Sequence, residues 1–168
     1  MNSVSPASDD RLRWPVLLLS LGVTAGAAAL GAVASVNAAG FYAELAKPAW
    51  APPSAVFGPV WTVLYFLMAI AAWLVWRTAG FRAARASLAL YVAQLVLNAL
   101  WTWLFFRWHS GRWAFVEINA LWLILFFTLV SFWRTRALAG GLLFPYWAWV
   151  TFATVLTYAV WQRNPGVL

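Results

Sequence analysis

The chain has 168 residues, of which 65% are hydrophobic and 9% are charged, and its formal net charge is +7. Soluble globular domains carry about 45–50% apolar and about 25% charged residues, so this composition excludes an ordinary water-soluble domain and favours a protein whose solvent is lipid. The sequence contains no cysteine, which excludes disulfides, iron–sulfur clusters and thiolate metal sites.

Apolar segments of helical length follow a polar tail, residues 1–13, which we expect to be disordered. A helix needs about 20 residues to cross the hydrocarbon core of a bilayer. Five segments meet that length, at about 14–36, 55–76, 86–106, 113–133 and 138–161. The sequence therefore predicts an integral, multi-pass membrane protein with a single all-α domain of five helices over residues 14–164.

The first segment, WPVLLLSLGVTAGAAALGAVASV, follows RLR and precedes NAAG, so a cleaved signal peptide is an alternative. Its apolar run exceeds the roughly 7–15 residues of a signal core, which favours a membrane helix. Gly22 and Gly26, like Ala27 and Gly31, form small-xxx-small pairs that allow close helix approach. The sequence leaves open whether these pairs serve packing within the chain or dimerisation.

The connection between the first two segments, FYAELAKPAWAPPSAVFGPVW, is long, aromatic and rich in proline. FYAELA predicts a short helical turn that lays Phe41, Tyr42 and Leu45 over the bundle. The prolines at 48, 52 and 53 stiffen the return path. We therefore predict a semi-rigid lid over a pocket, with Trp50 covered rather than exposed.

Basic residues indicate how the helices are oriented in the membrane. With five helices, one side carries seven arginines, at 11, 13, 77, 82, 85, 134 and 136, and the other carries Lys47, Arg107, Arg112 and Arg163. Such arginines set topology and anchor helix ends at head groups, and they argue against nucleic-acid binding. The excess predicts a cytoplasmic N-terminus in a bacterial membrane.

Polar residues at membrane depth are costly and mark either helix contacts or a site. In the third segment Gln94, Asn98 and Trp101 recur at steps of four and three, so they share a helical face. That face predicts either a hydrogen bond between helices or a polar anchor in a ligand pocket. Trp61 and Tyr65 share a face of the second segment, and a fifth-segment face holds Trp149, Ala153, Leu156 and Thr157. Aromatic walls with few polar groups suit a flat apolar ligand.

The remaining polar residues offer little chemistry. Glu117 lies one turn into the fourth segment, where the helix dipole favours a carboxylate, although a place at the pocket mouth stays open. The single histidine, His109, lies in the loop RWHSGR. Because two of the four acidic residues fall in the tail, the sequence argues against a hydrolase, a proton pump and a metal enzyme. We predict no metal site and no cofactor.

Several stretches resemble the translocator protein family, whose members are also called tryptophan-rich sensory proteins or peripheral benzodiazepine receptors. FYAELAKPAWAPP followed by FGPVWTVLYFLM resembles the family's first loop and second helix. QLVLNALWTWLFF is similar to its glutamine–asparagine–tryptophan motif, and FPYWAWVTFATVLTYAVWQRN resembles its last helix. The resemblance covers residues 41–164 and suggests a bacterial member.

The resemblance implies a five-helix bundle, usually a homodimer, whose pocket is capped by the first loop and binds porphyrins such as protoporphyrin IX. It also implies binding of synthetic isoquinoline-carboxamide and benzodiazepine drugs, and of sterols in animal members. The positions that match ligand-contacting or loop residues are Tyr42, Trp50, Pro53, Trp61, Asn98, Trp101, Trp149, Ala153 and Leu156, and Trp113 and Glu117 match positions of the family's fourth helix.

Some positions depart from the family pattern. Thr157 stands where many members have asparagine, and Glu117 stands where the acid is usually aspartate. Leu156, Tyr158 and Arg163 fit a loose cholesterol-recognition pattern, but animal members have the basic residue one position earlier, where this chain has a glutamine. This departure weakens the case for sterol binding.

These features lead to a hypothesis and its alternatives. We expect a membrane receptor or transporter-like protein that binds porphyrins and similar planar apolar ligands and serves tetrapyrrole-linked sensing or regulation. The propionates of a porphyrin would meet Lys47, Arg107 or Arg112. One alternative is light-dependent porphyrin breakdown through Trp61 and Trp149, and another is sterol or lipid binding. A structural membrane partner without a small ligand is a further alternative.

Overall fold

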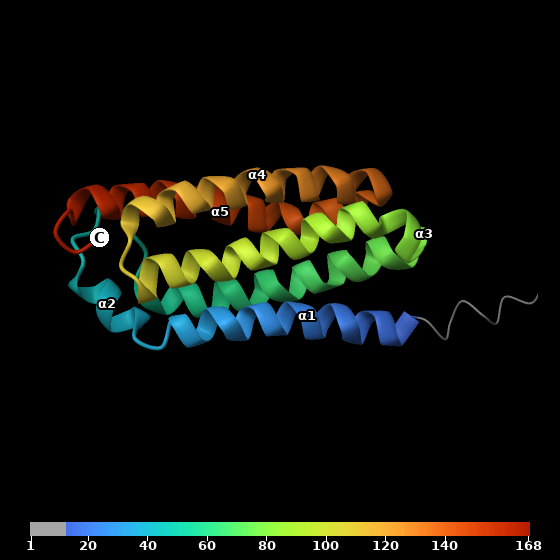
Figure 1. The fold of residues 1–168 in the computed structure, drawn as a ribbon, viewed down its shortest axis with the longest axis horizontal. Helices are drawn as coiled ribbons and strands as arrows, with labels where there is room; N and C mark the ends of the chain where they lie inside the picture. Colours follow the sequence, from blue (N-terminus) through green and yellow to red (C-terminus); the bar gives the residue numbers. More distant parts are fainter. Residues whose placement is uncertain (1–12) are drawn as a thin grey trace, which may run out of the picture.

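The computed structural model describes residues 13–168, and it confirms the predicted class, a helical membrane bundle (Figure 1). The tail that we expect to be disordered, residues 1–13, lies outside the described part up to residue 12, and residue 13 begins the first helix. The elements in chain order are α1 (Arg13–Ala34), α2 (Ala38–Glu44), the short 3-10 helix η2 (Ser54–Val56), α3 (Phe57–Thr102), the π-helical turn η3 (Trp103–Arg107), α4 (Gly111–Thr135) and α5 (Ala137–Arg163).

The long helix α3 contains two membrane passes. Ser54–Arg107 forms one continuous apolar span of 54 residues, which would be about 80 Å long if straight, against roughly 30 Å of hydrocarbon. The chain reverses at Gly80, where φ is 74° and ψ is 161°, and Figure 1 shows α3 folding back there. Only glycine adopts that backbone region readily. With α1, α4 and α5, the two arms of α3 make the five passes.

The predicted segments 55–76 and 86–106 leave a gap of nine residues, RTAGFRAAR, that would be a loop, but helix continues up to Gly80 and resumes directly after it. Alanines and arginines, which favour helix, fill most of RTAGFRAAR, so a single glycine is enough to reverse the chain. The break between α4 and α5 is equally short. Arg136 alone separates them, with an extended backbone at φ −158° and ψ 116°.

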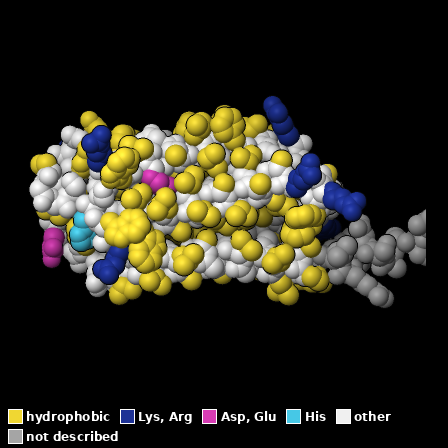
Figure 2. Space-filling view, viewed as in Figure 1, with side chains coloured by type: hydrophobic (Ala, Val, Ile, Leu, Met, Phe, Trp, Pro, Cys, Tyr) yellow, Lys and Arg dark blue, Asp and Glu magenta, His cyan; other side chains and the backbone are white. Residues whose placement is uncertain are grey.

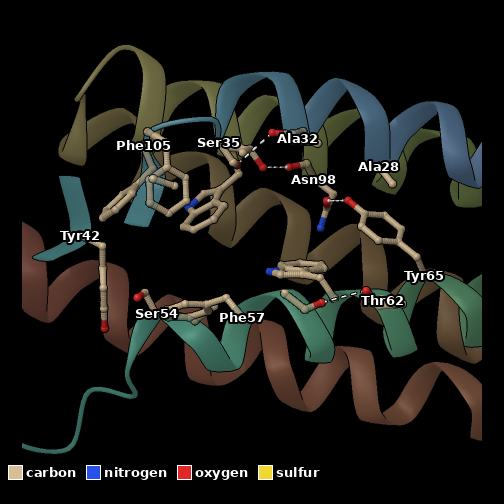
Figure 3. A pocket seen from close by; sticks show the side chains of 18 of the residues that line it. Ala28, Ala32, Ser35, Tyr42, Ser54, Phe57, Thr62, Tyr65, Asn98 and Phe105 are labelled. Atoms are coloured by element: carbon tan, nitrogen blue, oxygen red, sulfur yellow. Dashed lines mark hydrogen bonds between the residues drawn. The ribbon is translucent and has the colours of Figure 1, made fainter. Parts of the chain in front are cut away.

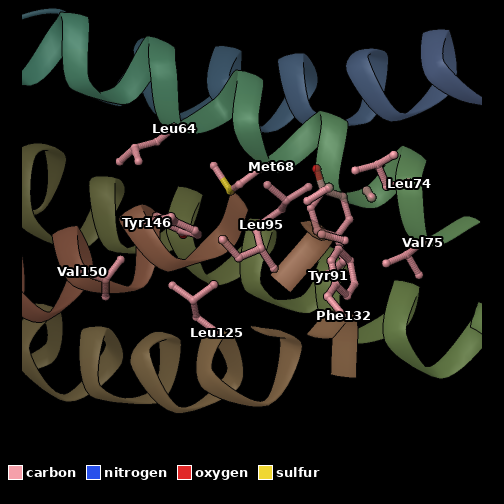
Figure 4. Close-up of a cluster of buried hydrophobic side chains, with 14 of the residues drawn as sticks. Leu64, Met68, Leu74, Val75, Tyr91, Leu95, Leu125, Phe132, Tyr146 and Val150 are labelled. Carbon is pink, nitrogen blue, oxygen red and sulfur yellow. The ribbon is translucent and has the colours of Figure 1, made fainter. Parts of the chain in front are cut away.

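The core forms where both arms of α3 meet α4 and α5. Figure 4 shows Leu64 and Met68 from the first arm, Leu95 from the second arm, Leu125 from α4 and Tyr146 from α5 pointing into one cluster. At the start of α5, a Cβ added to Gly140 would lie 2.7 Å from the Cβ of Trp133, so glycine is needed for this close approach of α5 to α4. The helix α1 packs against α3 and η3.

Candidate ligand cavity

A cavity of about 710 Å³ lies between α1 and α3, near the end of the bundle where the chain connects these two helices. Its walls are mostly apolar. They are formed by Leu21, Thr24, Ala25, Ala28, Gly31, Ala32 and Ser35 around α1, by Ala38, Ala39, Tyr42 and Ser54 between α1 and α3, by Phe57, Gly58, Trp61, Thr62, Tyr65, Phe66, Ala69, Asn98, Trp101 and Thr102 of α3, by Phe105 and Phe106 of η3, and by Ala153, Leu156, Thr157 and Val160 of α5.

A chain of hydrogen bonds holds the amide of Asn98 at the cavity wall. The hydroxyl of Tyr65 donates to Oδ1 of Asn98 over 2.7 Å (Figure 3), and Nδ2 of Asn98 donates to the hydroxyl of Tyr146 over 2.9 Å. Tyr146 is fully buried behind the wall. Because both ends of the amide are engaged, its orientation is fixed, and a remaining lone pair of the carbonyl oxygen can accept a bond from a ligand.

A second polar contact joins α1 to α3. The hydroxyls of Thr24 and Tyr91 lie 2.5 Å apart, and both side chains are buried. Thr24 also lines the cavity. Since α1 presents mainly alanine and glycine to α3, this bond specifies how α1 sits against the second arm of α3.

Aromatic rings form two parts of the cavity wall. The ring of Trp61 lies 5.6 Å from that of Tyr65 and 6.0 Å from that of Tyr146, measured between centroids. Trp101 stacks on Phe105 at 5.3 Å. The indole Nε1 of Trp101 is buried and has no hydrogen-bond partner among the described residues. An unused buried donor is costly, and because this nitrogen is not exposed to the cavity, it reaches an acceptor on a ligand only when the indole turns toward the cavity.

The connection between α1 and α3, residues 35–56, covers this end of the bundle, and we call it the lid segment. Tyr42 of α2 is buried, lines the cavity, and donates its hydroxyl to the carbonyl of Pro52 over 3.1 Å. Burial raises the pKa of this hydroxyl above its ordinary value. The ammonium of Lys47 donates to the carbonyls of residues 42, 43 and 45, which caps the end of α2.

Asn164, just after α5, fastens the lid segment to the bundle. Its Oδ1 accepts from the backbone N–H of Ala46 over 2.9 Å, and its Nδ2 donates to the Ala46 carbonyl, also over 2.9 Å. The same Nδ2 donates to the carbonyl of Val160 over 2.7 Å. A further contact is the stacking of Phe41 on His109, with ring centroids 4.0 Å apart. The predicted lid therefore rests on the bundle instead of pointing into solvent.

The structure brings most of the predicted site residues to one cavity. Tyr42, Trp61, Tyr65, Asn98, Trp101, Ala153 and Leu156 all line it, and their role in ligand binding stays a prediction.

Five of the eleven positions matched to the family lie outside the lining, namely Trp50, Pro53, Trp113, Glu117 and Trp149. Trp50 is 49% exposed, contrary to our expectation, and its ring packs on Phe152 at 5.8 Å. Trp149 contacts Phe57, with ring centroids 6.1 Å apart, and Phe57 itself lines the cavity. At the start of α3, directly after the lid segment, Phe57 therefore forms the part of the cavity wall where we expected Trp149.

Other singled-out residues occupy the interior or the surface. Gln94 is fully buried and donates to the sulfur of Met68 at 3.7 Å, away from the cavity lining. Both carboxylate oxygens of Glu117 are buried without a hydrogen-bond partner among the described residues. Leu156 is buried whereas Tyr158 and Arg163 are exposed, so the loose cholesterol pattern does not form one surface.

Sequence reasoning missed the contribution of α1 and of the phenylalanines at positions 57 and 106. Ala25, Ala28 and Ala32 recur at steps of three and four, but alanines at such spacing give no signal beyond helix packing. Thr24 was the available signal, because a hydroxyl in the middle of an apolar segment requires a partner.

Comparison with known proteins identifies relatives of the whole helical region. The sequence model of the TspO/MBR family matches residues 17–162. The translocator protein of Homo sapiens is 41% identical over 128 residues, which cover 75% of this chain and 76% of the human protein. Protein CrtK of Rhodobacter capsulatus is 39% identical, with 83% and 87% covered. The tryptophan-rich sensory protein of Cereibacter sphaeroides is 36% identical, with 90% and 92% covered.

Proposed function

We propose that this chain, which belongs to the TspO/MBR family of membrane proteins, binds porphyrins of the protoporphyrin IX type and similar planar apolar ligands. The observation that carries the proposal is the cavity of about 710 Å³, which combines aromatic walls with one oriented amide, that of Asn98. Small-molecule sites occupy roughly 300–1,000 Å³ and have mostly apolar walls with a few placed polar groups.

The wall offers groups that suit the macrocycle of a porphyrin, and the surface outside the lining offers a cation for its propionates. The ring of Trp61 offers a face for stacking on the macrocycle. The amide of Asn98, and the free indole N–H of Trp101 when its ring turns toward the cavity, supply hydrogen bonds inside the apolar space. The ammonium of Lys47 is already engaged by three carbonyls, so Arg107, exposed at the end of η3, is the better partner for an anionic propionate.

The ligand is sensed or passed on by this protein. The relative from Cereibacter sphaeroides is named a tryptophan-rich sensory protein. A lid segment that closes the cavity couples ligand occupancy to the conformation of the loop and of the α5 terminus, which gives sensing a structural route.

The test is a titration of the detergent-purified protein with protoporphyrin IX in the dark, followed by the Soret absorbance. We expect Trp61→Phe, which leaves a smaller ring at this position, to weaken binding by up to about 10-fold, the factor for the loss of a whole aromatic contact. Trp133→Phe is the matched control, because Trp133 is 53% exposed and lies outside the cavity lining. Equal affinities in both variants would overturn the proposal.

An illuminated arm of the same titration separates binding from light-dependent breakdown. Binding alone leaves the amount of porphyrin unchanged in light and dark. Loss of porphyrin absorbance in light, abolished in a Trp61→Phe, Trp149→Phe double variant, would instead support the alternative activity.

We infer that the N-terminus of this integral membrane protein is cytoplasmic and that the lid segment faces the other side of a bacterial membrane. The support is the excess of basic residues on the side of the tail, where seven arginines stand against three arginines and one lysine on the other side. A reporter active only outside the cytoplasm, fused after Leu168, should be active. Activity of a cytoplasm-only reporter at the same place would reverse the orientation.

We also infer that two copies associate through α1. Gly22 and Gly26 are exposed, and a Cβ added at either would meet no atom of this chain within 4 Å, so their smallness serves no packing within it. Gly26→Leu should lower the dimer fraction in cross-linking, while Val63→Leu on the exposed face of α3 should not. An unchanged dimer fraction in Gly26→Leu would rule out this interface.

A further inference from the structure

A second hollow lies toward the end of the bundle that is remote from the lid segment. It has a volume of about 420 Å³ and is lined by Leu90 of the second arm of α3 and by Phe127, Val130, Ser131, Arg134 and Thr135 of α4. None of these residues lines the cavity beneath the lid segment. The hollow is therefore separate from the proposed porphyrin site.

Its lining is ordered along the bundle axis from apolar to polar. Phe127 and Arg134 are seven residues apart on α4, which is about 10 Å along a helix, with Val130 between them. Arg134 lies in the last turn of α4, at the end of the membrane pass, and Phe127 lies deeper. Hydrophobic contacts thus lie toward the bilayer centre, and the positive charge lies at the level of the head groups.

Polar groups in the hollow are available to an anion. The described residues give Arg134 no ion pair, hydrogen bond or ring contact, whereas Arg77 lies over the ring of Trp73 at 5.2 Å. The hydroxyls of Ser87 and Ser131 share one hydrogen bond of 2.7 Å. When Ser87 donates that bond, the proton of Ser131 is free to donate to a ligand.

The surrounding charge favours an anion as well. Arginines at 77, 82, 85, 134 and 136 gather at this end, which appears as the dark blue groups on the right of Figure 2. The two acids of the described residues lie elsewhere, Glu44 in α2 of the lid segment and Glu117 in the first half of α4. No described carboxylate therefore offsets the positive field at this hollow.

We propose that this hollow binds one anionic phospholipid. The phosphate pairs with the guanidinium of Arg134, with Ser131 as an additional donor, and the first part of an acyl chain lies on Leu90, Phe127 and Val130. Basic pockets between membrane helices hold anionic head groups in this way. A free phosphate would leave the apolar half of the hollow uncovered, whereas a lipid fills both halves from the surrounding membrane.

The test is native mass spectrometry of the purified protein titrated with phosphatidylglycerol, phosphatidylcholine or inorganic phosphate. We expect phosphatidylglycerol to bind in preference to the other two. Arg134→Gln should weaken that binding about fivefold, the factor for one basic residue at a membrane surface. Arg77→Gln removes the same charge from the same end but does not line the hollow, so it should weaken binding less than Arg134→Gln does.

A second variant tests the apolar half. Val130→Trp fills the hollow but keeps Arg134, and it should also weaken phosphatidylglycerol binding. Equal loss in Arg134→Gln and Arg77→Gln would show a diffuse charge effect and overturn the proposal. So would equal binding of the two phospholipids, or tight binding of phosphate alone. Size-exclusion profiles that match the wild type identify the variants that are folded.

Discussion

Removing the side chain of Asn164 should open the lid segment. Asn164→Ala deletes three hydrogen bonds, two to the backbone of Ala46 and one to the carbonyl of Val160. A hydrogen bond within a protein contributes about 0.5–1.5 kcal/mol net. Because Ala46 is exposed and water can replace the lost partner, we expect local opening to become easier by about 1–3 kcal/mol.

That free energy corresponds to roughly a 5- to 150-fold rise in the open population of the lid segment. Amide hydrogen exchange measures it directly, and residues 42–50 should exchange faster by a factor in that range. If the porphyrin leaves the cavity past the lid segment, its dissociation rate in a stopped-flow experiment should rise in parallel. Thermal unfolding of the transmembrane helices should change little, since the core cluster is untouched.

The matched control is Asn119→Ala. Asn119 is exposed on α4, and its Nδ2 donates to the carbonyl of Phe115 in the same helix over 2.7 Å. The change of residue is identical, but no contact to the lid segment is lost. Unchanged exchange at residues 42–50 in Asn164→Ala, or an equal increase in Asn119→Ala, would refute the reasoning.

Three further substitutions test the fold and the hydrogen-bond chain by thermal unfolding in detergent. Gly80→Ala should destabilise by about 1–3 kcal/mol, although no atom blocks the added Cβ, because the backbone there suits glycine only; normal stability would contradict this. Gly140→Ala should cost about 1–3 kcal/mol by steric overlap, whereas Gly141→Ala, whose nearest atom is 4.0 Å away, should be tolerated; equal stabilities would refute the close approach. Tyr146→Phe leaves Nδ2 of Asn98 without its acceptor, so it should lower both stability, by about 1–3 kcal/mol, and porphyrin affinity; unchanged affinity would show that the orientation of the amide does not matter to the ligand.

The sequence predicts the helices well, because membrane thickness sets their length and apolar runs are easy to recognise. It also predicts which faces of α3 meet, since Trp61 and Tyr65 share one helical face and Asn98 and Trp101 share another. The reversal at Gly80 escapes this reasoning. Nothing in the composition of RTAGFRAAR distinguishes a nine-residue loop from two helices joined at one residue, and only the backbone angles decide.

The position of Trp149 could not be predicted, for a different reason. Periodicity places it on the face of α5 that also carries Ala153 and Leu156, both of which line the cavity. Whether a side chain on that face reaches the cavity depends on the neighbouring element, and here Phe57 at the start of α3 packs against it. A helical face gives a direction, but the distance from the face to the cavity is set by tertiary packing.

The small residues of α1 indicate that the cavity is maintained by the sequence and is not a packing defect. Membrane helices associate through van der Waals packing, so an open volume of about 710 Å³ forfeits contacts that a larger side chain would make. Ala25, Ala28 and Ala32 face this volume, where leucine would fill it at no cost in hydrophobicity. The oriented amide of Asn98 and the free N–H of Trp101 also face or border the space, and both are costly in lipid when unused. A bundle selected for stability alone would have larger residues in place of these alanines and would lack both the amide of Asn98 and the unpaired N–H of Trp101. The combination of the three features favours a ligand-binding role over a purely structural one.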